Sequence, residues 1–175
     1  VDFAASAFFG LTLLYTLPFF PNKQNARNWK GVKIYIVGIT WVGVTVILPL
    51  VEAEIPFSKD VLLMAFQRFL LVFSLVLVFE IVDVKLDDPH LQTVPQKIGV
   101  EPTKKLGYVL LFLLLLLEFF YSNNHHFLPL FFKLLVCGAI AVFLYFANEN
   151  RSRYYASFWV ESVPILWWLV LVLEN

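Results

Sequence analysis

The stretch VLLMAFQRFLLVFSLVLVFEIV, residues 61–82, decides the fold class, because this long apolar run contains only two charged side chains. About twenty apolar residues in a helix cross a hydrocarbon core of about 30 Å, and in lipid a helix satisfies its own backbone amides. The rest of the chain has the same character: 60% of its 175 residues are hydrophobic and 18% are aromatic. We therefore expect an integral membrane protein.

Further apolar runs of similar length lie on both sides of this stretch. They cover residues 3–20, 34–51, 106–121, 127–147 and 155–173. Together with residues 61–82 they predict an all-α, polytopic transmembrane helix bundle with about six spans. We expect residues 1–175 to form a single transmembrane helical domain, and Trp and Tyr near the predicted helix ends are typical of membrane interfaces.

The connecting segments differ in charge. Ten of the thirteen Lys and Arg residues fall in three alternate loops, at residues 23–33, 85–105 and 151–153. Short loops with such an excess of basic residues face the cytoplasm, so we expect the loop from Asp83 to Lys105 to be cytoplasmic, in a bacterial inner membrane. The formal net charge is zero, which argues against a nucleic-acid partner.

A cluster of carboxylates follows the run at residues 61–82. In EIVDVKLDDPHLQTVP, residues 80–95, Glu80 lies three positions before Asp83, and Asp83 lies four before Asp87. If the helix continues, all three side chains project from one face, where their mutual repulsion favours a bound cation. Mg²⁺ is typically held by one or two carboxylates plus substrate phosphates. Asp88, followed by Pro89, is expected to cap or end the helix.

A second interpretation of the cluster is structural. Charge runs are usually solvated surfaces, and these carboxylates would then pair with lysines of the same loop. The lysines concerned are Lys85, Lys97, Lys104 and Lys105. Residue type and spacing leave both interpretations open.

The segment DVKLDDPHLQTVPQKIGV, residues 83–100, resembles the second aspartate-rich loop of the UbiA superfamily of intramembrane prenyltransferases. The shared features are Asp83 and Asp87, then Thr93-Val94-Pro95, then Gly99 before the next helix. The segment LLYTLPFFPNKQNARNWKGVKIYIVGITWVG, residues 13–43, resembles that family's loop between its fourth and fifth helices. The interval from Asp87 to Thr93 is about one residue shorter than the common pattern, and the adjacent Asp88 restores the alternative register.

The resemblance implies an Mg²⁺-dependent enzyme that transfers a polyprenyl group from a prenyl diphosphate to an aromatic or other lipid acceptor. Asp83 and Asp87 would be the catalytic metal ligands, and Lys30 and Lys97 would add donors to the diphosphate. The family has nine helices, so we expect an N-terminal segment of about three helices, with the first aspartate-rich motif, to be missing from this chain.

Two other functions remain open. A non-catalytic UbiA-like subunit or scaffold with membrane protein partners would explain a chain with one Asp-x-x-x-Asp sequence, and an upstream copy of that motif would favour the enzyme. A transporter is less consistent with the chain, which has no mid-membrane acid network. Arg68, Glu118 and Glu161 lie inside predicted spans, where exposure to lipid is costly. For Arg68 and Glu118, both mutual pairing and snorkelling to the outer surface are open.

Overall fold

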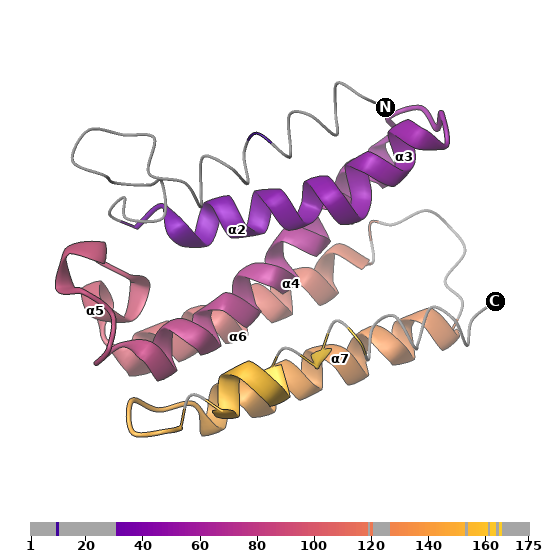
Figure 1. Cartoon of the computed structure of the whole chain (residues 1–175). Coiled ribbons are helices and arrows are strands. Elements are labelled where there is room, and N and C mark those ends of the chain that lie inside the picture. The colour runs from indigo at the N-terminus through magenta and orange to yellow at the C-terminus, as the bar shows by residue number, and fades with distance from the viewer. Residues whose placement is uncertain are drawn as a thin grey trace. The chain divides into compact units, whose positions relative to one another are not determined.

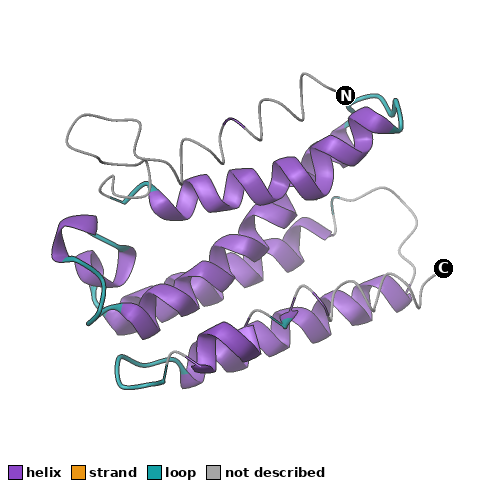
Figure 2. Ribbon diagram, viewed as in Figure 1, coloured by secondary structure: helices purple, strands orange, loops and turns teal. Residues whose placement is uncertain are grey.

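The computed structural model describes residues 10, 31–118, 120, 127–152, 154–160, 162–163 and 165. All regular elements within these residues are helical, and the described ranges contain no strand (Figures 1 and 2). The chain divides into two units, Val1–Phe73 with Asp88–Thr93 and Ser74–Asp87 with Val94–Asn175. The all-α class predicted from the sequence is confirmed for the described part of the chain.

The first unit contains a helical segment over residues 33–52, with a change of pitch in the middle. Helix α2 (Lys33–Val42) continues through the π-helical turn η3 (Gly43–Ile47) into α3 (Leu48–Glu52) (Figure 1). Pro49 in the first turn of α3 lacks an N–H and its ring crowds the preceding turn, so the wider π turn accommodates it. The predicted run at 34–51 is thus a continuous apolar helical segment.

Aromatic side chains and a glycine join α2 to the first part of α4 (Lys59–Asp83) within this unit. The rings of Tyr35 and Phe73 meet edge to face with centroids 5.4 Å apart. A Cβ on Gly38 would lie 2.7 Å from the ring of Phe69, so the absence of a side chain there allows the close approach.

Helix α4 closely matches the predicted run at 61–82. Ser58 begins it, since its hydroxyl accepts a hydrogen bond from the Val61 N–H at 3.3 Å, and Asp60 lies in the first turn, where a negative charge is favourable. Within the described residues, α4 and the segment 33–52 are the two helical segments long and apolar enough to cross a membrane. Two of the six predicted spans therefore have the required length and composition.

The second unit contains the end of α4, then α5 (Val94–Ile98), α6 (Val100–Glu118), α7 (Phe127–Phe146) and the π-helical η5 (Tyr155–Val160). Helices α6 and α7 pack against each other, and Leu111, Leu114 and Ile140 are buried. Helix α6 begins six residues before the predicted run at 106–121, and α7 matches the run at 127–147. The run at 3–20 and most of the run at 155–173 lie outside the described residues.

Candidate functional site

The two aspartates of the candidate site lie on a single backbone turn at the end of α4. The carbonyl of Asp83, the last residue of the helix, accepts hydrogen bonds from the N–H groups of Leu86 and Asp87, both at 2.8 Å. The second bond joins the backbones of Asp83 and Asp87, so the two residues stand at the two ends of one turn. Both residues are half-buried. Helix α4 ends at Asp83 and does not continue through Asp87.

Glu80 does not share this position with the two aspartates, which corrects the expectation of three carboxylates on one face. Its side chain is 2% exposed and accepts a hydrogen bond at 3.0 Å from the N–H of Val94, the first residue of α5. This N–H is one of the donors that a helix start leaves without an intrahelical partner. Glu80 therefore fastens the end of the loop back onto α4.

A second bond holds the loop near the aspartates. The side-chain amide of Gln96 on α5 donates to the carbonyl of Asp87 at 3.1 Å. Both Glu80 and Gln96 thus tie α5 to the turn that carries the aspartates. No periodicity or motif in the sequence singles out Gln96, because its partner is a backbone carbonyl nine residues away.

The Thr-Val-Pro sequence and the following glycine begin the next two helices. Thr93 and Pro95 are buried, and Pro95 takes the second position of α5, where its missing N–H costs no hydrogen bond. Gly99 has φ +88° and separates α5 from α6, as expected for a glycine that opens the next helix. Its carbonyl accepts from the Thr103 hydroxyl at 2.7 Å.

Asp88 caps the element after it and not the helix before it. Its side chain accepts from the His90 N–H at 2.9 Å, at the start of the 3₁₀ helix η4 (Pro89–Leu91). In the same unit, the Leu91 carbonyl accepts from the Gly31 N–H at 2.8 Å, which brings the loop before α2 to η4.

The loop after α4 also meets the loop after α7, within the second unit. The Lys85 ammonium contacts the Glu149 carboxylate at 3.0 Å and donates to the Asn150 side chain at 2.8 Å. Two of the basic loops predicted to share one side of the bundle therefore lie together. The Lys85 ammonium is therefore paired with an acidic residue of another loop, Glu149.

Of the two lysines predicted to bind the diphosphate, Lys97 lies within the described residues and Lys30 does not. Lys97 is exposed in the last turn of α5, on the helix that Glu80 and Gln96 hold, whereas Lys30 lies outside the described residues.

No group of three or more His, Cys, Asp or Glu side chains gathers at one point in the described ranges. Two neighbouring carboxylates match the usual Mg²⁺ arrangement in which waters and substrate phosphates complete the coordination.

Charged residues within the apolar helices form a separate feature. Glu118, at the end of α6, pairs with Lys133 of α7. From the sequence, Arg68 is a candidate partner of Glu118. The structure pairs Glu118 with Lys133, and this ion pair links α6 to α7. Glu161 lies outside the described residues.

No protein-family model matches the chain, and neither a curated protein nor a solved structure matches it.

Proposed function

We propose that the chain is a UbiA-like intramembrane prenyltransferase, and that the turn carrying Asp83 and Asp87 binds the headgroup of a prenyl diphosphate. The observation that carries the proposal is that hydrogen bonds hold this turn in place. It is closed by the Asp87 to Asp83 backbone bond and is tied to α5 by Glu80 and Gln96. These bonds hold the backbone of the turn in place.

The fastened turn suits cation binding for an electrostatic reason. Two carboxylates on one turn carry like charges, which repel each other. A backbone that is already bonded keeps the two groups from moving apart, so a divalent cation relieves the repulsion at little conformational cost.

Each residue of the turn then has a role. Asp83 and Asp87 would hold Mg²⁺, which when bound neutralises the diphosphate and assists its departure from the prenyl group. Lys97, exposed on the fastened helix α5, supplies an ammonium to the same diphosphate. The prenyl chain lies along the apolar helices, and we place the enzyme in a bacterial inner membrane with this loop on the cytoplasmic side.

The test is binding of farnesyl diphosphate to the purified chain in detergent, measured with and without Mg²⁺. We expect binding to require Mg²⁺ and to weaken by about tenfold or more in Asp83→Asn or Asp87→Asn, because the loss of even an outer-shell partner of a metal ligand typically costs about 10–100-fold in affinity. Asp88→Asn is the matched control, because Asp88 caps η4 and stands next to the motif. Binding that ignores both EDTA and Asp83→Asn would overturn the proposal.

A non-catalytic subunit of the same fold is the second candidate. This 175-residue sequence contains one Asp-x-x-x-Asp motif, at Asp83 and Asp87, and the resembled family uses two such motifs. Incubation with a labelled prenyl diphosphate and an aromatic acceptor separates the two functions. Binding with no transfer identifies the subunit, and transfer identifies the enzyme.

A further inference from the structure

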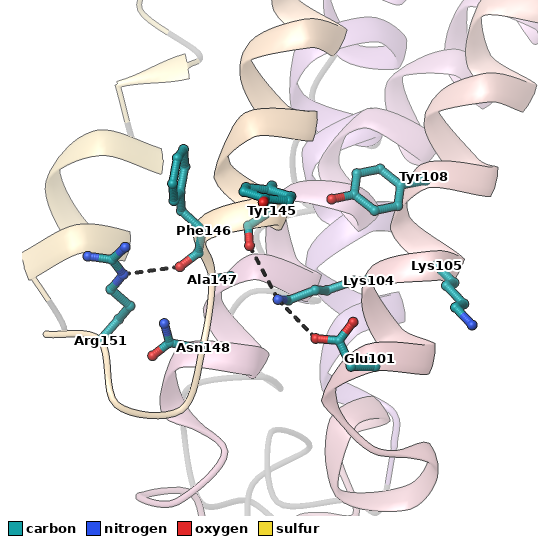
Figure 3. A pocket seen from close by; sticks show the side chains of 9 residues that line it. All are labelled: Glu101, Lys104, Lys105, Tyr108, Tyr145, Phe146, Ala147, Asn148 and Arg151. Atoms are coloured by element: carbon teal, nitrogen blue, oxygen red, sulfur yellow. Dashed lines mark hydrogen bonds and ion pairs between the residues drawn. The ribbon is translucent and has the colours of Figure 1, made fainter.

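A pocket of about 560 Å³ lies in the second unit between the start of α6 and the end of α7. Its lining combines cationic and aromatic side chains and includes an amide and one carboxylate (Figure 3). Lys104, Lys105 and Tyr108 come from α6, Tyr145 comes from α7, and Asn148 and Arg151 come from the loop after α7. Within the described residues, none of these belongs to the turn with Asp83 and Asp87.

Lys104 and Arg151 have more N–H donors than their hydrogen bonds within the protein use. Lys104 contacts the Tyr145 carbonyl at 3.3 Å and the Glu101 carboxylate at 3.2 Å, and Arg151 donates from Nε to the Phe146 carbonyl at 3.1 Å (Figure 3). An ammonium has three N–H donors and a guanidinium has five, so both retain donors for a ligand. These bonds also keep the two cations at the pocket by fixing them to the last turn of α7.

The one carboxylate in the lining is easily displaced. The Glu101 side chain is 74% exposed and that of Lys104 is 14% exposed, so the charge held inside the pocket is the positive one. An ion pair with one partner in water contributes little free energy. A phosphate oxygen could therefore replace the Glu101 carboxylate on Lys104 at small cost.

Exposed apolar stripes run away from the pocket along both helices. On α6 the exposed side chains Tyr108, Phe112 and Leu116 recur every four residues, and on α7 Val142 and Tyr145 lie three apart. Helical residues with these spacings share one face. A soluble anion would use the cations alone, whereas a lipid would also cover the apolar stripes with its acyl chains.

We propose that this pocket binds the phosphate group of an anionic membrane lipid, with Lys104 and Arg151 as the phosphate ligands and Tyr108 and Tyr145 beside the glycerol region. Basic pockets between membrane helices commonly hold such headgroups. The site uses none of the residues assigned to the prenyl diphosphate turn of the proposed function, and it needs only that α6 and α7 lie in a membrane.

The test is native mass spectrometry of the whole chain in detergent, titrated with phosphatidylglycerol or with phosphatidylcholine of the same acyl chains. We expect about tenfold tighter binding of phosphatidylglycerol, and loss of this preference in the double variant Lys104→Gln with Arg151→Gln, since each basic residue adds to the attraction. Lys104→Arg should keep the preference. Lys59→Gln, at the start of α4, is the control, because it removes a charge from a residue that does not line the pocket.

The remaining outcomes decide against the proposal. An equal loss of preference in Lys59→Gln would mean that net charge, and not this pocket, selects the lipid. Displacement of the lipid by inorganic phosphate at the same concentration would assign the pocket to a soluble phosphate. Lower stability of the double variant with an unchanged lipid preference would reduce Lys104 and Arg151 to capping residues of α7. Asp83→Asn should leave the preference unchanged, which separates this test from that of the prenyltransferase.

Discussion

The Glu80 carboxylate accepts a hydrogen bond from the Val94 N–H at 3.0 Å, so a buried acid near the end of α4 caps the start of α5. A carboxylate that is only 2% exposed is costly unless it is hydrogen-bonded. Its use as a cap explains why a charge can stand inside the apolar end of α4. It also removes Glu80 from the group of candidate metal ligands.

Glu80→Leu should destabilise the fold by about 1–3 kcal/mol, because the Val94 N–H loses its acceptor. Glu80→Gln keeps an acceptor oxygen and should cost less. Thermal unfolding in detergent, followed by circular dichroism, measures both. Glu52→Leu is the control, since Glu52 is an exposed acid at the end of α3. Equal effects of Glu52→Leu and Glu80→Leu would contradict the capping role.

Gly99→Ala tests the junction between α5 and α6. Gly99 has φ +88°, a conformation that costs a residue with a Cβ about 1–2 kcal/mol. The control is Gly138→Ala on α7, where a Cβ would have no heavy atom within 4 Å and where alanine favours the helix. We expect a lower melting temperature for Gly99→Ala and an unchanged or higher one for Gly138→Ala. A fall of similar size in both variants would argue against the left-handed junction.

Gly107→Val tests the contact between α6 and α7. A Cβ at Gly107 would lie 2.6 Å from Cδ1 of Leu144, and Leu144 is fully buried and has little room to move. Overpacking of this kind costs about 1–3 kcal/mol. Gly138→Val places the same side chain on α7 without a clash, so it controls for the loss of glycine. Melting temperatures of the two variants in the same detergent give the comparison, and equal values would mean that the helices separate easily at Gly107.

The apolar runs at 34–51 and 61–82 could be read from the sequence, because hydrophobic length alone determines a helix in lipid. The residue at which α4 ends, Asp83, could not be read in this way. The Asp88-Pro89 pair favours an extended backbone at Asp88, which has ψ 128°, and the chain turns away before it.

The residues that hold the candidate site in place could not be predicted from the sequence either. Spacing alone put Glu80 with the two aspartates, but tertiary contact with Val94 turned it into a cap. Gln96 and the pocket around Lys104 depend on which loops and helices meet, and a single sequence carries no signal for such contacts. By contrast, Gly99 was predictable, since a glycine between two helices commonly has positive φ.

The ion pair between Glu118 and Lys133 joins α6 to α7 far from the aspartate turn in sequence, and the two side chains are only 12% and 19% exposed. Removing one partner leaves the other charge in an apolar environment, so Lys133→Met or Glu118→Met alone should cost about 3 kcal/mol. The double variant should be close to the wild type in stability, because no charge is then left without its partner. A double-mutant cycle on the free energy of unfolding in mixed micelles gives the coupling between the two residues, which we expect to exceed about 2 kcal/mol.

The pair Lys85 and Glu149 is the matched control, since its side chains are 51% and 45% exposed and its coupling should stay below about 1 kcal/mol. Equal coupling in the two pairs would show that Glu118 and Lys133 are solvated at the membrane surface and do not fix the packing of α6 on α7.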